Sequence, residues 1–413
     1  MKLQVTHISY LLSNALGMDR LTQNFLNFAR SHLCFLIATN IHGVFVNILL
    51  LREADSVNIT IYYNMVSFLA SGIAMMIAGA LAKYVDLKII TFIGIGFHIV
   101  AYGIFLIFME SITSYVILVA ILLGMGGGFF YLTYFVSLSA YSTDDTRDVS
   151  IAFIGIVGGA IALAVPTISG AVIGAFEGLT GYTIMFGCAF IIAGIAFYLF
   201  TKLPKVPPVK KPPKYFQCLK QIHTNKSWFF VTAQIFLRSV REGVFAFFLN
   251  VLLFQYVQNE SIIGINSLLV GFISIFAQYT CGRISKPGNR IKMMTVATIT
   301  LLASVSILYL ELNAATVLLL SFLNAFFVVV LMNPSSSIDF IVIQSTPDGF
   351  TCREEYLGLF EFYRALGRNV GLIFLLLMPQ TSFGYVTALM TITGLQFLTV
   401  LCAKSAVKSL KKT

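Results

Sequence analysis

Charged side chains are scarce in this sequence. Asp, Glu, Lys and Arg make up only 11% of the 413 residues, whereas a soluble domain contains about 25%. Hydrophobic residues account for 58% of the chain, and windows of about 20 apolar residues, each long enough to cross a bilayer as a helix, recur along nearly its whole length. These runs are continuous rather than alternating, which excludes a β-barrel and predicts an all-α polytopic membrane protein.

The sequence also lacks the motifs of several functional classes. No GxxxxGK[ST] loop is present, which excludes ATP-driven transport by this chain. No HxxxxD, GxSxG or metal-spaced histidine cluster is present, so we expect no enzyme activity, no cofactor and no metal site. The six scattered cysteines contain no CxxC pair and are expected to be small apolar side chains in helices. The polar start "MKLQVTHISY" does not have the pattern of a cleavable signal peptide.

The apolar runs predict twelve transmembrane helices. Their approximate limits are 30–51, 60–82, 88–109, 113–139, 149–173, 180–201, 227–256, 261–282, 292–311, 316–341, 355–379 and 383–403.

The basic residues test this map, because Lys and Arg collect in cytoplasmic loops. Of the 27 Lys and Arg residues, 22 lie on one predicted side, Arg52 alone lies on the other, and four lie within the seventh and eleventh spans. We therefore expect both termini in the cytoplasm and the protein in the plasma (cytoplasmic) membrane. The net charge of +10 reflects this asymmetry and attraction to anionic lipid rather than binding of nucleic acid.

The two halves of the chain are weakly repeated. The stretch "IHGVFVNILLLREADSVN" (41–58) aligns with "REGVFAFFLNVLLFQYVQNE" (241–260). Segment 202–226, rich in Pro and Lys and without an apolar period, predicts a cytoplasmic linker between two pseudo-symmetric six-helix bundles. The expected units are a cytoplasmic or interfacial segment at 1–29 with "LTQNFLNFARSHL" on the membrane surface, bundles at 30–201 and 227–403, and a basic cytoplasmic tail at 404–413.

With its two six-helix repeats and long central linker, the chain resembles the major facilitator superfamily from about residue 30 to 403. The family's loop motif between spans 2 and 3, G-x-L-a-D-r-x-G-r-R/K, corresponds here to "GALAKYVDLK". Gly79 and Lys88 fit the motif, whereas Lys83 replaces the acidic residue and Asp86 replaces the second glycine. The resemblance implies that this loop gates the cytoplasmic side, with altered charge.

The corresponding loop of the second half is "GRISKPGNRIK". It supplies the gating candidates Gly282, Lys286 and Arg290, and Lys286 again stands where the family has an acid. A second family motif, typical of exporters, is partly matched in "GIVGGAIALAVPTISGAVIGA" by Pro166 and Gly170. This partial match slightly favours efflux. The alternative is that these small residues let two membrane helices approach closely.

Seven ionisable residues interrupt the apolar runs of the second half, where burial of each is costly. These intramembrane charges are Arg238, Arg241 and Glu242 in the seventh span, Asp339 in the tenth, and Glu361, Arg364 and Arg368 in the eleventh. Spacings of three and four residues place members of each set on one helical face. They form either a buried salt-bridge network or a site in which the arginines bind an anionic substrate, with the three acids as proton-coupling candidates.

The first half carries histidines instead of acids at membrane depth. His42, which aligns with Glu242 in the repeat, and His98 are further proton-coupling candidates, because histidine titrates near physiological pH. The alternative for each is a hydrogen-bonded histidine inside the bundle. Tyr131 and Tyr134 in the fourth span are candidates for contacting substrate, or else lie at the membrane interface.

The leading interpretation is a secondary active, H⁺-coupled transporter that works by alternating access, as a monomer in the bilayer. Its substrate is expected to be a small anionic or amphipathic solute. The alternatives are a flippase for a lipid-linked anionic molecule and a non-transporting receptor or scaffold with the same fold.

Overall fold

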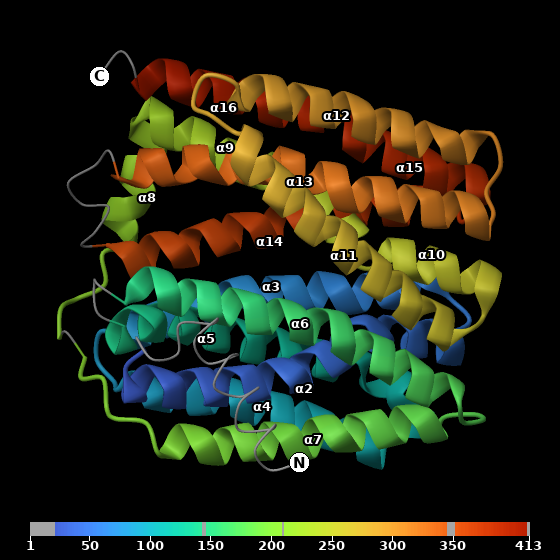
Figure 1. Cartoon of the computed structure of the whole chain (residues 1–413), viewed down its shortest axis with the longest axis horizontal. Helices are drawn as coiled ribbons and strands as arrows, with labels where there is room; N and C mark the ends of the chain where they lie inside the picture. The colour runs from blue at the N-terminus through green and yellow to red at the C-terminus, as the bar shows by residue number, and fades with distance from the viewer. Residues whose placement is uncertain (1–20, 143–145, 209, 345–351, 411–413) are drawn as a thin grey trace, which may run out of the picture.

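The structure, a computed structural model, describes residues 21–142, 146–208, 210–344 and 352–410. Within these ranges the chain forms helices and no strand, as the composition predicted. Figure 1 shows the first half of the chain, from blue to green, as one bundle of long helices packed against the second half, from yellow to red.

The first half runs antiparallel from helix to helix. It contains α2 (Gln23–Ala54), α3 (Val57–Leu81), α4 (Leu87–Ile107), the 3-10 helix η2 (Met109–Tyr115), α5 (Val116–Tyr141), α6 (Arg147–Gly174) and α7 (Thr180–Thr201).

The second half follows a linker that contains α8. This linker helix spans Tyr215–Thr224. The elements of the second half are α9 (Lys226–Phe245), α10 (Phe248–Val257), α11 (Glu260–Ile284), α12 (Arg290–Ser306), η3 (Ile307–Tyr309), α13 (Ala314–Gln344), α14 (Arg353–Leu377), α15 (Ser382–Gly394) and α16 (Gln396–Leu410). We call the end of the bundles next to α8 the linker end and the opposite end the far end (Figure 1).

Eleven helical segments in the described part of the chain are long and apolar enough to cross a membrane. They coincide with eleven of the twelve predicted spans. The predicted eleventh span is α14, which is 25 residues long but interrupted by charged side chains. Hydropathy alone therefore does not predict that α14 spans the membrane. A spanning helix with these charges needs other groups of the protein to compensate them.

Three features of the structure differ from the sequence predictions. The predicted seventh span is not one helix, because the α-helix breaks between α9 and α10, where Phe247 has φ −130° and ψ −31°. Segment 202–226 was expected to have no apolar period, yet Cys218 and Ile222, four residues apart, bury one face of α8. The expected surface helix is not separate, since from Gln23 onward it is the first part of α2.

Small residues allow close helix contacts, and polar side chains cap the helix starts. A Cβ on Gly124 or Gly128 of α5 would collide with the backbone oxygen of Ser67 or Ser71 on α3, so the glycine run serves close helix contact. Helix starts are capped by side chains that accept hydrogen bonds from the first free N–H groups. Asn259, for example, accepts from the N–H groups of Ser261 and Ile262 at the start of α11.

Two helix pairs provide most of the contact between the halves. Near the linker end and towards the middle, α14 packs against α3, and a Cβ on Gly72 would lie 2.9 Å from the Ala365 Cβ. Near the far end, α11 packs against α6, and a Cβ on Gly264 would lie 3.0 Å from the carbonyl oxygen of Pro166. The partial exporter motif therefore provides a close crossing between the two halves.

Candidate functional site

The intramembrane charges gather around the middle of α9 and α14. Arg241 and Glu242 are the two central residues of the membrane-length segment Lys226–Val257, and Arg364 lies near the middle of α14. Because solute sites in proteins of this architecture lie near the bilayer midplane, this depth makes the cluster a candidate site.

One group of four charges connects α9 with α14. The Arg368 guanidinium donates from Nη2 to Glu242 Oε1 at 2.6 Å and from Nη1 to Glu361 Oε1 at 2.8 Å. Arg364 Nη1 donates to the other oxygen of Glu361 at 3.0 Å. Two arginines and two carboxylates thus neutralise each other in one hydrogen-bonded chain.

This chain of charges faces the first half of the protein. The Arg368 guanidinium lies 5.0 Å from the ring centre of Phe68 on α3, a cation–π contact. Tyr131 on α5 lies within electrostatic range of Glu361 and Arg368, and it is 57% exposed although it belongs to a central helix. Tyr131 is therefore an exposed phenol of the first half near the charges of α14.

A second ion pair connects α9 with α13. Arg238 Nη1 lies 2.9 Å from Asp339 Oδ2 and donates to Ser335 Oγ at 3.0 Å. Gln234 Nε2 donates to the other Asp339 oxygen at 2.8 Å. Both charged side chains are buried, and the surrounding polar groups satisfy the remaining oxygen of Asp339. This pair therefore has the properties of a structural link between two helices.

Arg241 differs from the other three arginines, because no carboxylate of the described residues pairs with it. Its Nη2 donates to Asn324 Oδ1 at 2.5 Å and its Nε donates to Thr393 Oγ1 at 3.3 Å. The guanidinium carbon lies 3.7 Å from the centre of the Phe245 ring. The residue is only 2% exposed, so a full positive charge is held inside the bundle by neutral groups alone.

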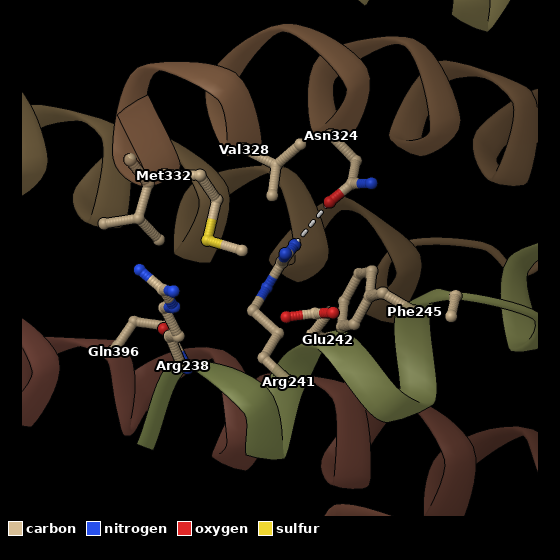
Figure 2. A pocket seen from close by; sticks show the side chains of 10 residues that line it. Arg238, Arg241, Glu242, Phe245, Asn324, Val328, Met332 and Gln396 are labelled. Atoms are coloured by element: carbon tan, nitrogen blue, oxygen red, sulfur yellow. Dashed lines mark hydrogen bonds between the residues drawn. The ribbon is translucent and has the colours of Figure 1, made fainter. Parts of the chain in front are cut away.

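A cavity of about 180 Å³ lies beside Arg241. Figure 2 shows the Arg238 and Arg241 side chains rising from α9 toward α13, from which Val328 and Met332 point back. The remaining lining residues come from α9, the break that follows it, α13 and α16: Glu242, Phe245, Ala246, Asn324, Leu331 and Gln396. The cavity therefore has its charged groups on the α9 wall, neutral polar groups at Asn324 and Gln396, and apolar side chains elsewhere.

The candidates of the first half lie in a separate cluster. His42 Nδ1 is 2.8 Å from the Tyr102 hydroxyl, and His98 Nδ1 is 3.0 Å from the Gly94 carbonyl oxygen. Tyr134 stacks on His32 with ring centres 4.4 Å apart. All of these contacts are within the first half, so the structure brings Tyr131 to the charges of α14 but does not bring His42, His98 or Tyr134 to them.

At the linker end, Lys83 joins the two halves. Its Nζ lies 2.9 Å from Glu354 Oε2 and 3.4 Å from Glu355 Oε2, at the start of α14. Burial alone would lower the pKa of the Lys83 ammonium, but the hydrogen bond and charge of Glu354, together with Glu355, outweigh burial and raise the pKa above 10.5. We call Lys83, Glu354 and Glu355 the linker-end latch.

The linker itself closes over this latch. The backbone N–H of Lys210 donates to the Lys83 carbonyl at 2.9 Å, and that of Lys214 donates to Glu355 at 3.2 Å. The Tyr215 hydroxyl on α8 donates to the Met76 carbonyl on α3 at 2.7 Å. A Cβ on Gly79 would meet this same hydroxyl at 2.5 Å, so the glycine of the loop motif makes room for α8.

The other loop candidates have local roles. Asp86 caps α4 by accepting from the Lys88 N–H at 2.8 Å, and Lys88 Nζ donates to the Leu203 carbonyl at 3.0 Å. In the second half, Gly282 and Arg290 line an open pocket at the linker end, and Lys286 is exposed. Neither Lys286 nor Arg290 forms an ion pair with another described residue, so the second loop does not repeat the Lys83 contact.

At the far end, a second polar cluster joins the halves. Arg52 Nη1 at the end of α2 lies 3.0 Å from Glu260 Oε1 at the start of α11. The Tyr182 hydroxyl on α7 donates to the same oxygen at 3.0 Å. We call Arg52, Tyr182 and Glu260 the far-end latch. In both latches, a base from the first half meets an acid at the start of a helix from the second half.

Several site residues escaped the sequence analysis. Asn324 interrupts the run "LLLSFLNAFFVVV", and that single amide was the available signal. Thr393 and Gln396 gave none, because neutral polar residues are common in helices. Glu354, Glu355 and Glu260 stand at helix starts, where acids also stabilise the helix dipole, so their pairing with Lys83 and Arg52 could not be inferred.

Comparisons with known proteins give a family model and two related sequences. A family model described as the Major Facilitator Superfamily matches residues 31–372. The uncharacterized protein YqgE of Bacillus subtilis (strain 168) is 27% identical over 339 residues, which cover 81% of this chain and 78% of that protein. A Geobacillus stearothermophilus protein described by its place in the sodM 3' region is 25% identical over 152 residues, 37% of this chain and 71% of that protein.

Solved structures share the fold at low sequence identity. The nucleoside transporter NupG matches with a TM-score of 0.67 at 11% identity, covering 93% of this chain and 100% of that chain. A bacterial homologue of the iron transporter ferroportin in an inward-facing state matches with a TM-score of 0.67 at 12% identity, covering 94% and 98%. The human organic anion transporter MFSD10 matches with a TM-score of 0.61 at 14% identity, covering 92% and 98%.

Proposed function

The chain belongs to the Major Facilitator Superfamily, and on that premise we propose that it is a secondary active transporter that moves a small anionic solute across the cytoplasmic membrane by alternating access. The two helical halves would rock against each other around the intramembrane charges. The linker end, where Lys and Arg gather, is assigned to the cytoplasm.

The observation that carries the anionic solute is the unpaired charge of Arg241. The other six intramembrane charges form pairs that sum to zero. Arg241 adds one positive charge beside a cavity at mid-depth. Burial of an uncompensated charge is costly unless it serves a ligand or ion pathway. A bound anion would supply the missing countercharge.

The two latches support alternating access. Opening toward the cytoplasm would break the contacts of Lys83 with Glu354 and Glu355, and opening toward the outside would break the contact of Arg52 with Glu260. Because each latch joins opposite charges from the two halves, each stabilises closure at its own end. Lys83 thus performs the gating role with the polarity of the family's acidic residue reversed.

Proton coupling is assigned to the acids of the α9–α14 chain. Glu242 and Glu361 both bind Arg368. Protonation of either carboxyl would remove a countercharge from Arg368 and so change the charge beside the solute, which links proton binding to solute binding. The contacts favour these glutamates over His42 and His98, which bond within the first half. Asp339 is already held by Arg238 and Gln234.

The proposal is tested by flux measurements in proteoliposomes. Purified protein is reconstituted with a pH-sensitive dye inside, and a panel of organic monoanions, dianions and neutral analogues is added under an imposed pH gradient. Anion-dependent proton movement, absent from protein-free vesicles, is expected. Its sign under an outside-acid gradient decides the direction, for which the partial motif in α6 favours efflux. If no anion moves protons or itself, the receptor or scaffold alternative replaces the transporter.

A further inference from the structure

We propose that the cavity beside Arg241 binds a compact monocarboxylate, with the carboxylate on the guanidinium and the apolar body against α13. This inference rests on the proposed function and specifies the chemical class of its solute.

The charge balance indicates a single negative charge. Each of the other arginines already has a carboxylate partner, so Arg241 is the one intramembrane charge of the described residues that remains to be compensated. With the three acids ionised, one carboxylate brings the net charge of the seven residues from plus one to zero. A dianion would leave one negative charge in a cavity whose other walls are largely apolar, where charge is costly.

The hydrogen bonds that Arg241 makes to described residues leave N–H groups for that carboxylate. Described residues accept hydrogen bonds from Arg241 Nε and Nη2, but none accepts from Nη1. A guanidinium has five N–H groups, so several remain for a ligand. Phe245 covers one face of the guanidinium and Asn324 and Thr393 hold it in place. The group is therefore oriented in advance, which lowers the entropic cost of binding.

The size and lining of the cavity limit the rest of the solute. Its volume is about 180 Å³, whereas sites for drug-sized ligands measure about 300–1,000 Å³. An apolar cavity of about 150 Å³ is known to hold benzene. The walls opposite the arginines are formed by Val328, Leu331 and Met332. A carboxylate with a body of about six carbons matches both the volume and the lining.

The helix break adds a second positive element. Ala246, which lies in the break, also lines the cavity. Between described residues, no backbone hydrogen bond joins the N–H groups of Phe248 or Leu249 to α9, so α10 begins with free donors in mid-membrane. Interrupted helices that present such N-termini to anionic groups occur at transporter midplanes. The break therefore places the start of α10 two residues after Ala246, which lines the cavity.

The test measures the melting temperature of the purified full-length chain in detergent against four probes. Benzoate and hexanoate are the expected ligands, benzamide is the neutral match to benzoate, and phthalate is the dianion. A ligand that binds only the folded protein raises the melting temperature with concentration. We expect saturable increases with benzoate and hexanoate, no increase with benzamide, and at least a tenfold weaker effect with phthalate.

Variants locate the site. Arg241→Gln removes the charge, and Val328→Phe fills the cavity but keeps Arg241. Arg241→Gln should weaken benzoate binding about 10- to 100-fold, the range for loss of a charge-assisted hydrogen bond. Val328→Phe should weaken it at least tenfold, because the phenyl ring occupies the volume of the solute. Arg283→Gln is the matched control, because Arg283 is exposed on α11 and stacks on Tyr279 at 4.6 Å, away from the cavity. If Arg241→Gln does not fold, Val328→Phe alone still decides the outcome.

The outcomes separate this inference from the transport function. Equal benzoate shifts in wild type, Val328→Phe and Arg241→Gln would overturn the assigned site. The absence of any shift with both monocarboxylates would overturn the assigned class. In either case, anion-driven proton flux in proteoliposomes with another anion would leave the transporter proposal standing, whereas its absence across the whole panel would remove both.

Discussion

Pairing decides which of the seven intramembrane charges are available to a solute. The pairs Arg238–Asp339 and Arg368–Glu242 are buried or half-buried, at 2.9 Å and 2.6 Å. Ion pairs of this kind rarely add net stability over apolar residues, but loss of one partner leaves an uncompensated charge. Structural and solute-binding arginines should therefore respond differently to mutation.

The Arg238–Asp339 pair provides the test at this scale. Asp339→Asn should lower the stability of the protein by about 3–5 kcal/mol, because a buried guanidinium then loses its countercharge. The double variant Arg238→Met/Asp339→Leu should recover most of that loss. Thermal melting of both variants in detergent checks this. A double variant as unstable as Asp339→Asn would show that Arg238 and Asp339 do not act as a pair.

At the residue scale, sequence located the charges but not their partners. Arg238, Arg241, Arg364 and Arg368 stand out because each interrupts an apolar run. Glu242 and Arg368 are 126 positions apart, so no local spacing could join them. The difference between Arg241 and the other arginines depends on the packing of α9, α13 and α16, which only the fold supplies.

Among the elements, the broken seventh span distinguishes the second half from the first. Phe45 and Phe245 occupy the same repeat position, and each half then ends its helix at a residue with φ 47°, Asp55 or Gln258. From the phenylalanine to that residue the first half has 10 positions and the second has 13. The break at Phe247 accompanies the three extra residues, and it opens the helix beside Arg241.

Elements with strong apolar runs were predictable, whereas short or interrupted ones were not. Eleven spans follow from hydropathy. The break in "FAFFLN" carries neither Pro nor Gly, so nothing in the sequence marks it. The helix α8 was missed because only Cys218 and Ile222 are buried among Lys and Pro residues, a pattern too short to recognise without its partners α9 and α14.

The linker-end latch gives a prediction about how the α3–α4 loop meets α14. Lys83→Glu would place three carboxylates together, and their repulsion should shift the protein toward the state open to the cytoplasm. Each 1.4 kcal/mol of repulsion changes the ratio of the two populations about tenfold. Anion flux should fall on the order of tenfold. The exchange Lys83→Glu/Glu354→Lys should restore part of it, because a base again lies between two acids.

The control for Lys83→Glu is Lys205→Glu, which makes the same change of charge at an exposed residue of the linker. It should leave flux near the wild-type level. Equal losses in Lys205→Glu and Lys83→Glu would mean that the net charge at the linker end, rather than the latch, controls transport.

The raised pKa of Lys83 keeps the latch charged, and its stabilising contribution is lost only as the pH rises above 10.5. Physiological pH changes must therefore act elsewhere.

For the whole molecule, the two halves and their repeat were predicted, but their contacts were not. The family resemblance implied gating at the α3–α4 loop, and the replacement of its acid by Lys83 left the polarity open. Only the structure brings Glu354 and Glu355 to Lys83 and Glu260 to Arg52. The halves are thus held together by ion pairs at both ends.

The most direct measurement of alternating access is the distance between spin labels at both ends of the same protein. One pair replaces Tyr84 and Lys286 at the linker end, and the other replaces Glu177 and Glu311 at the far end, all exposed residues, in a background without the six native cysteines. On addition of a transported anion or on acidification, one distance should lengthen while the other stays at the closed value. Distances that both lengthen, or that both stay fixed while anion is bound, would contradict transport by alternating access.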